Sequence, residues 1–371
     1  MELIRRGLRD WAAARDSVFA PAVVASAPAF QLQTVTNEQS QTQLAFAAMF
    51  MTDTHLSTKG FSAQATCQML EQTRAARHYY LGDDIDIEAR QLQQSGGLNN
   101  PWQRQYIGHV LRKAAEAPTV KLIGNHDVAL NGRRIPHEGK NLWHRRLTGK
   151  NLLGVAVKYQ HDYQDGQGRT FRLLHAHQVA DAVLGTSKGA LYLISDIGYA
   201  ALPQLDKAVA AVTGAHDYHI THGVRARFDT GLGLSAALAR VADRNPQLDG
   251  IIHGHFHRPD IARTPGGKLV IDAGSCTEHP RALVEDARGT KALLTWHPDR
   301  IVLREENGAQ RVIAHQVLGL NVTQPKLHED KFTQQADRLI GLVQRLWPVA
   351  GEARVPKRKV ATAMGLFAKK L

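Results

Sequence analysis

Short apolar runs that each end at a polar motif constrain this chain more than any other feature. Five such runs are Leu44–Met51, His78–Leu81, Thr119–Ile123, Arg172–Leu174 and Gly250–Ile252. Runs of this length predict buried strands, and helical patterns occur between them at Ser62–Arg77, Trp102–Ala117 and Ser235–Arg244. Alternating strands and helices indicate an α/β fold, in which functional groups gather beyond the carboxyl ends of the strands.

The domain organisation follows from where this pattern begins and ends. At 371 residues, a single core of about 250 residues with extensions is favoured. Residues 1–43 are predicted to be a leader and linker, 44–317 the core domain, and 318–371 a C-terminal amphipathic helix and basic tail. Residues 179–227 show a helical pattern interrupted by glycines, which predicts an inserted lid; the alternative is an ordinary connecting region.

The net charge and the two terminal segments indicate what the protein could bind and where it could be located. A net charge of +12 favours phosphates, nucleic acids or anionic lipid. The apolar stripe of Phe332–Trp347 and the basic tail predict peripheral membrane contact, or else a helix packed on the core. No run of about twenty apolar residues exists. We expect a cytoplasmic protein; secretion is the alternative, since an arginine-rich start precedes an Ala25-Ser26-Ala27 sequence.

The polar motifs supply ligands for metal ions. They are Asp53-Thr54-His55, Gly82-Asp83-Asp84-Ile85-Asp86, Gly124-Asn125-His126-Asp127, His175-Ala176-His177 and Gly254-His255-Phe256-His257. Each motif alone is weak, but a site that hydrolyses a phosphate ester with two metals needs a bridging carboxylate with imidazole and amide ligands around it. The ordered set supplies them. The two cysteines, Cys67 and Cys276, are far apart in sequence and support neither a disulfide framework nor a cysteine zinc site.

This ordered set resembles the calcineurin-like metallophosphoesterase superfamily over about residues 45–297. The resemblance implies a four-layer α/β/β/α sandwich with the helical lid inserted. It also implies two divalent metal ions, with Mn²⁺ favoured and Fe or Zn as alternatives. One metal would be held by Asp53, His55, Asp83 and His257, and the other by Asp83, Asn125, His175 and His255.

The same resemblance implies the reaction. A hydroxide shared by the metals attacks phosphorus, His126 assists the leaving group, and Asp127 orients His126. His177 could replace His175 as the ligand, because residues two apart on a strand face the same side. Otherwise His177, like Asp86, would support the ligands from outside. Arg225 and Arg227 in the lid are candidates for a substrate phosphate, or are solvated surface arginines.

Within the superfamily, the group of UDP-2,3-diacylglucosamine diphosphatases shows further similarity. The shared features include Ser195–Tyr199, Gly254–Pro259 and Asp272–Ser275. The chain departs from that group at Thr54, at Ala176-His177, and in its leader and tail. The expected function is therefore hydrolysis of a phosphoester or pyrophosphate bond, plausibly in a UDP-2,3-diacylglucosamine-like substrate. The alternatives are a phosphodiesterase or phosphatase acting on a nucleotide, nucleic acid or phosphoprotein, and, last, an inactive scaffold.

Overall fold

Two large sheets form the centre of the protein. The structure is a computed structural model that describes residues 28–56, 61–84, 100–126, 151–152, 155–179, 233–277, 279–322 and 327–346. The nine-stranded sheet has the order β17-β16-β15-β14-β3-β5-β6-β8-β7, and the five-stranded sheet the order β12-β13-β11-β10-β9. A small third sheet has the order β1-β2-β4. Strands and helices together confirm an α/β fold.

In the first part of the chain strands alternate with helices, and from β11 to β17 strands follow one another directly. The strands of the first half are β1 (Gln33–Thr36), β2 (Thr42–Phe46), β3 (Ala48–Met51), β4 (Thr73–Ala75), β5 (His78–Tyr80), β6 (Thr119–Leu122), β7 (Asn151–Leu152), β8 (Val155–Lys158), β9 (His161–Gln164) and β10 (Thr170–Leu174). Those of the second half are β11 (Gly250–His253), β12 (Asp260–Arg263), β13 (Leu269–Asp272), β14 (Arg281–Glu285), β15 (Lys291–Trp296), β16 (Arg300–Glu305) and β17 (Gln310–Ala314). The helices are α2 (Ala63–Glu71), α4 (Pro101–Glu116), α9 (Leu234–Asp243), the 3₁₀ turn η3 (His315–Leu318) and α10 (Lys331–Leu346).

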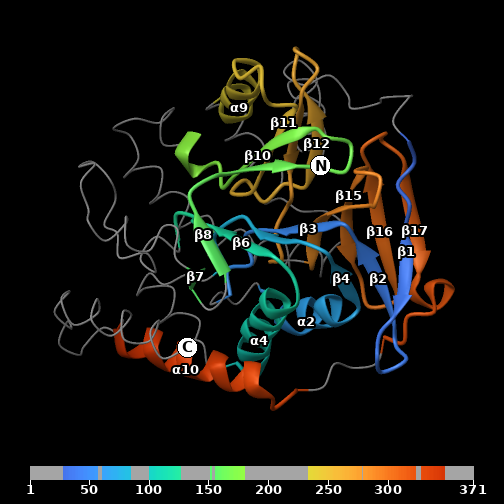
Figure 1. The fold of residues 1–371 in the computed structure, drawn as a ribbon, viewed down its shortest axis with the longest axis vertical. Coiled ribbons are helices and arrows are strands. Elements are labelled where there is room, and N and C mark those ends of the chain that lie inside the picture. Colours follow the sequence, from blue (N-terminus) through green and yellow to red (C-terminus); the bar gives the residue numbers. More distant parts are fainter. Residues whose placement is uncertain are drawn as a thin grey trace, which may run out of the picture.

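Alternation of buried side chains along the strands separates three apolar clusters. On β3, Met49 and Met51 face the helices α2 and α4, whereas Ala48 and Phe50 face the five-stranded sheet. On β11, Ile252 faces the other sheet and Ile251 packs against α9. Strands buried on both faces in this way are typical of parallel sheets covered by helices. Figure 1 shows α9 on the far side of both sheets from α2 and α4.

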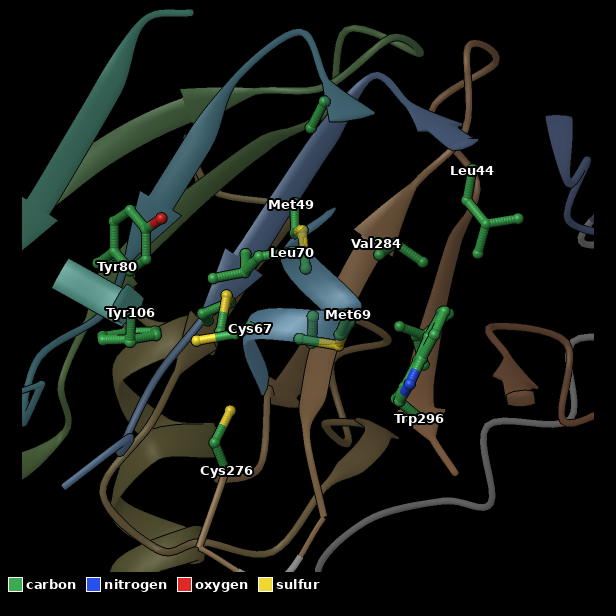
Figure 2. Packing of buried hydrophobic residues seen from close by; sticks show 14 of the residues in the cluster. Leu44, Met49, Cys67, Met69, Leu70, Tyr80, Tyr106, Cys276, Val284 and Trp296 are labelled. Atoms are coloured by element: carbon green, nitrogen blue, oxygen red, sulfur yellow. The ribbon is translucent and has the colours of Figure 1, made fainter. Parts of the chain in front are cut away.

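The largest cluster lies between the nine-stranded sheet and the helices α2, α4 and α10 (Figure 2). Met69 and Leu70 of α2 enter it beside Trp296 of β15, and each of the three is at most 1% exposed. Both cysteines lie here as buried free thiols, as the sequence had led us to expect. Burial raises the pKa of Cys276 to about 12, so this thiol stays protonated at neutral pH.

Two of the predicted elements divide where the sequence pattern is continuous. The run Leu44–Met51 was expected as one strand, but it forms β2 in the small sheet and β3 in the large one. The segment Ser62–Arg77 was expected as one helix, but α2 ends at Glu71 and β4 follows. In the first case the chain changes sheet at the break, and in the second it leaves the helix to pair with β2. A local period carries no information about the partner strand.

The boundaries of the core also differ from the prediction. Residues 28–43 belong to the core and are not a linker, because β1 pairs with β2 and Phe30 is 2% exposed within the largest cluster. Helix α10 packs on α4, and its Ala336, Leu339 and Ile340 are buried in that cluster. These three side chains face protein. Membrane contact by the remainder of the C-terminal segment stays a prediction.

Several predicted features lie outside the described residues. They are residues 1–27, almost all of the lid at 179–227 and the basic tail after residue 346. No helix in the described ranges combines the length and the hydrophobicity of a membrane span.

A buried ionic cluster ties the two large sheets together at the end remote from the polar motifs. The Lys291 Nζ atom lies 2.6 Å from Asp165 Oδ2 and 3.2 Å from Glu285 Oε2, and all three side chains are fully buried. The ammonium also lies 4.2 Å from the centroid of the Phe171 ring. Burial raises the pKa of Asp165, but Lys291 and Arg169 together outweigh this, so the pKa falls below its ordinary value.

Removing the cation of this cluster should destabilise the fold. Lys291→Ala removes the cation beside the buried Glu285 carboxylate and leaves Asp165 with Arg169 alone, and we expect a loss of about 3–5 kcal/mol in the free energy of unfolding. Arg300→Ala is the control, because Arg300 pairs with Asp299 at an exposed site and should cost less than about 1 kcal/mol. Urea denaturation measures both. Equal stabilities for the two variants would contradict a structural role for Lys291.

Candidate metal centre

The five polar motifs meet at one end of the two sheets. Strands β3, β5 and β6 are parallel neighbours, so the residues that follow them share an edge of the nine-stranded sheet. Strands β10 and β11 are parallel in the five-stranded sheet, with Leu174 opposite His253, so the later histidines reach the same end. The loops interlock through the backbone, where the His55 N–H donates to the Asp83 carbonyl over 3.0 Å.

Strained backbone is concentrated in these loops. Seven non-glycine residues in the described part of the chain have positive φ, and six of them belong to the motifs. The six are Asp53, His55, Asp83, Ala176, His255 and His257, with φ between 45° and 86°. Such conformations are costly for residues with a Cβ atom and persist where the surroundings impose them, most often at functional sites. The backbone is therefore shaped to aim these side chains inward.

Two glycines allow the loops to approach closely. A Cβ atom on Gly124 would lie 2.0 Å from Asp83 Oδ1, and one on Gly254 would lie 2.5 Å from Asp53 Oδ2. Neither position can carry a side chain without displacing a carboxylate. The glycines of the Gly-Asn-His-Asp and Gly-His-Phe-His motifs are thus required by the packing of the two aspartates.

One group of ligand atoms contains Asp53, His55 and His257, all buried. The Nε2 atoms of His55 and His257 lie 3.0 Å apart. Asp53 Oδ1 lies 3.1 Å from His257 Nε2 and 3.7 Å from His55 Nε2. Three donor atoms from the first and last motifs therefore converge on one small volume.

A second group contains Asp83, His175 and His255. The Nδ1 atom of His175 lies 2.8 Å from the Leu81 carbonyl, to which it can only donate, so in the neutral ring Nε2 carries the lone pair that can bind a metal. This Nε2 atom lies 2.9 Å from Asp83 Oδ2 and 3.9 Å from Asp53 Oδ1. The two groups are thus adjacent, and His175 faces both carboxylates.

His126 and Asn125 complete the described part of the site. The His126 N–H donates to Asp83 Oδ1 over 2.8 Å, and the His126 ring centroid lies 5.2 Å from that of His55. His55, Asp83 and His126 form a third group of mutually close ligand atoms. The imidazole of His126 is half-buried and lies next to the ligand atoms of His55 and Asp83.

The pKa values of Asp53, Asp83 and His255 are shifted toward the forms that bind a metal. Burial raises the pKa of Asp53, but the His257 and His175 imidazoles outweigh this and hold it well below its usual value. For Asp83, burial is likewise outweighed by His175 and His126, and the pKa is lowered. Burial, together with nearby His175, lowers the pKa of His255 well below normal. Ionised carboxylates and neutral imidazoles are what a divalent cation binds.

Two orphaned oxygens show that the residues fit a metal. Within the described part of the chain, the buried Oδ1 atoms of Asp53 and Asn125 accept no hydrogen bond. Buried polar atoms are nearly always satisfied, and an ion is one of the partners that accounts for an exception. Both oxygens belong to the ligand sets implied by the sequence, and carboxylate, amide and imidazole donors suit a hard or borderline divalent cation.

The structure brings together most of the predicted site. Six predicted ligands occupy the two groups above, and Asn125 adjoins them. His177 is buried near them, with its ring centroid 5.5 Å from that of His175, but it belongs to none of the groups of ligand atoms in the described residues. Asp86, Asp127, Arg225 and Arg227 lie outside the described residues.

Sequence reasoning missed two contributors. Thr52 donates its hydroxyl to Asp53 Oδ2, and the Leu81 carbonyl orients His175. Thr52 could have been recognised from the sequence, because a residue with a hydroxyl group directly precedes the aspartate ligand. The carbonyl is a backbone group and has no signature in the sequence.

Comparison with known proteins gives limited similarity. No protein-family model and no curated protein matches the chain. The solved structures similar to it include a single mutant of Vps29 from Entamoeba histolytica, at 14% identity and a TM-score of 0.30. They also include a dimetal phosphatase from Danio rerio, at 13% identity and a TM-score of 0.33. In both cases the match covers 72% of this chain and 98% of the other.

Substituting a motif glycine should remove metal without unfolding the protein. Gly124→Ala places a methyl group where Asp83 Oδ1 now lies, so we expect bound Mn²⁺ to fall by at least one equivalent in elemental analysis. Gly108→Ala in α4 is the control, because a methyl group there meets Thr333 at an ordinary 3.4 Å. Full metal content in Gly124→Ala would argue against Asp83 as a ligand.

The two neighbouring histidines should behave differently. His175→Ala should lose the second metal, because its Nε2 atom faces Asp83, whereas His177→Ala should retain two equivalents. Elemental analysis after dialysis against Mn²⁺ measures both variants side by side. The reverse pattern would make His177 the ligand.

Proposed function

We propose that this protein is a dinuclear metal-dependent phosphoesterase of the calcineurin-like superfamily. The observation that carries the proposal is the pair of adjacent ligand groups, Asp53 with His55 and His257, and Asp83 with His175 and His255. Structural ion pairs do not account for six such residues, because at least four imidazoles surround two carboxylates in a buried volume. Two-metal sites that transfer phosphoryl groups need such a set.

The arrangement of layers supports the same superfamily. Helices α2 and α4, the nine-stranded sheet, the five-stranded sheet and helix α9 follow one another across the molecule (Figure 1). We infer that this is the four-layer α/β/β/α sandwich, with the lid inserted after β10. The metal centre then lies where the carboxyl ends of both parallel sheets meet.

Each metal would have three ligands of its own and one ligand in common with the other metal. Asp53, His55 and His257 would hold one ion, Asn125, His175 and His255 the other, and Asp83 would contact both. Bound divalent cations, with Mn²⁺ proposed and Fe or Zn as alternatives, acidify water and neutralise charge that develops on phosphoryl oxygens. Asp83 is fit for its position because its Oδ1 atom is held by the His126 N–H while Oδ2 faces His175.

His126 is the proposed proton donor to the leaving oxygen. Its backbone N–H donates to Asp83, which places the half-buried imidazole beside the ligands. The His126 and His55 ring centroids lie 5.2 Å apart, so His126 is close enough to reach the leaving group of a phosphate bound beside the carboxylates. Asp127 is proposed to orient the His126 ring.

The substrate class is proposed from the motifs. The Gly254–Pro259 and Asp272–Ser275 segments resemble UDP-2,3-diacylglucosamine diphosphatases, which supports a pyrophosphate bond in a nucleotide-sugar lipid. A phosphodiester or phosphomonoester of a nucleotide, nucleic acid or protein is the alternative.

A panel of substrates tests the reaction. With Mn²⁺ present, we expect turnover of at least one of bis-p-nitrophenyl phosphate, p-nitrophenyl phosphate, UDP-2,3-diacylglucosamine and single-stranded DNA, and loss of turnover after chelation. His126→Ala should lower kcat by about 10²–10⁴-fold while both metals stay bound. His328→Ala is the control, because its half-exposed side chain lies 3.3 Å from Glu71 at the end of α2, and it should leave kcat unchanged.

The outcomes separate the hypotheses. Hydrolysis of the lipid substrate alone supports the pyrophosphatase proposal, and hydrolysis of the diester or of DNA supports the alternative. A protein that holds two metals and turns over none of the four substrates would contradict the enzyme proposal and favour a scaffold.

A further inference from the structure

The two central aspartates differ in how their second oxygen is satisfied. Each carboxylate accepts one backbone N–H from another motif: Asp53 Oδ2 from His255 over 2.8 Å, and Asp83 Oδ1 from His126 over 2.8 Å. Within the described part of the chain, a side-chain hydroxyl also reaches Asp53 Oδ2, that of Thr52, over 2.7 Å. The residue before Asp83 is Gly82, which has no side chain to offer.

This donor is locked in place by its surroundings. Thr52 is 1% exposed, and a Cβ atom on Gly254 would lie 1.9 Å from its hydroxyl oxygen. The glycine thus brings the His255 N–H and the Thr52 hydroxyl to the same carboxylate oxygen. A buried hydroxyl held this tightly cannot turn to another acceptor without moving the loop of the last motif.

These two hydrogen bonds to Oδ2 determine where the other oxygen of Asp53, Oδ1, lies. With Oδ2 accepting two hydrogen bonds, Oδ1 is left without one and lies 3.1, 3.7 and 3.9 Å from the Nε2 atoms of His257, His55 and His175. A carboxylate whose rotation is fixed by two donors presents a single oxygen to a cation. Donors of this kind raise metal affinity by orienting the ligand.

We propose that Thr52 is a positioning residue that fixes Asp53 as a one-oxygen ligand of the metal held by His55 and His257. The inference rests on the proposed two-metal function. It goes beyond that function because Thr52 touches neither metal nor substrate and acts through the Asp53 carboxylate. The metal held by Asn125, His175 and His255 does not depend on Thr52.

The test compares two substitutions at one position. Thr52→Val keeps the shape and removes the donor, whereas Thr52→Ser keeps the donor and removes the methyl group. Titration of each metal-free protein with Mn²⁺ in a calorimeter should show one site weakened by about 10–100-fold in Thr52→Val, with the other site unchanged. Thr52→Ser should restore both affinities. Substituted Co²⁺ gives a second readout, because its visible spectrum should change in Thr52→Val only.

A matched control lies two residues further on. Thr54 is also fully buried, but its hydroxyl donates to the Asp84 carbonyl over 3.0 Å and contacts neither carboxylate of the site. Thr54→Val removes a buried hydroxyl from the same loop and should keep both Mn²⁺ affinities. Thermal unfolding of all the metal-free variants shows whether a change in affinity follows from a loss of folded protein.

Each outcome decides between named possibilities. Two wild-type affinities in Thr52→Val would overturn this inference and leave the proposed function standing. Weakening in Thr52→Ser equal to that in Thr52→Val would also overturn it, since packing of the methyl group would then be responsible. A wild-type protein that binds no Mn²⁺ would overturn the proposed function itself.

Discussion

The burial of two carboxylates, Asp53 and Asp83, is the constraint on which the rest of this structure depends. Burial by itself raises the pKa of each and so disfavours the ionised form. They are held ionised by imidazoles from three other motifs and by backbone N–H groups aimed at them. The strained loops and the two close-packed glycines exist to bring those groups within reach. The site is therefore a product of several loops at once and of no single motif.

The two sheets bring these loops together. Parallel strands in both sheets end at the same edge, so loops that are distant in sequence meet there. At the opposite end, Lys291 sits between Asp165 and Glu285 and fixes the spacing of the two sheets. The apolar cluster between the sheets fills the space that separates these two ends. A rigid frame of this kind is what keeps ligand atoms from different layers within bonding distance.

Some elements could be predicted from the sequence and others could not. The helical periods at Trp102–Ala117, Ser235–Arg244 and Phe332–Trp347 correspond to α4, α9 and α10 within one residue at each end. The run Leu44–Met51 failed as a single strand because β2 and β3 belong to different sheets. Residues 28–43 were assigned to a linker, although β1 completes the small sheet. Local patterns report burial, whereas the choice of a strand's partner depends on contacts across the fold.

The kind of site could be read from the sequence, because the types of ligand residue and their order after successive strands predict a metal centre, for which we propose chemistry on phosphorus. How those residues are used depends on the fold in three dimensions. It set His175 against Asp83 through a bond to a backbone carbonyl, and it made the two oxygens of Asp53 unequal through Thr52 and the His255 N–H. These choices depend on the directions of lone pairs and donors in space, and a one-dimensional pattern of residues does not carry directions.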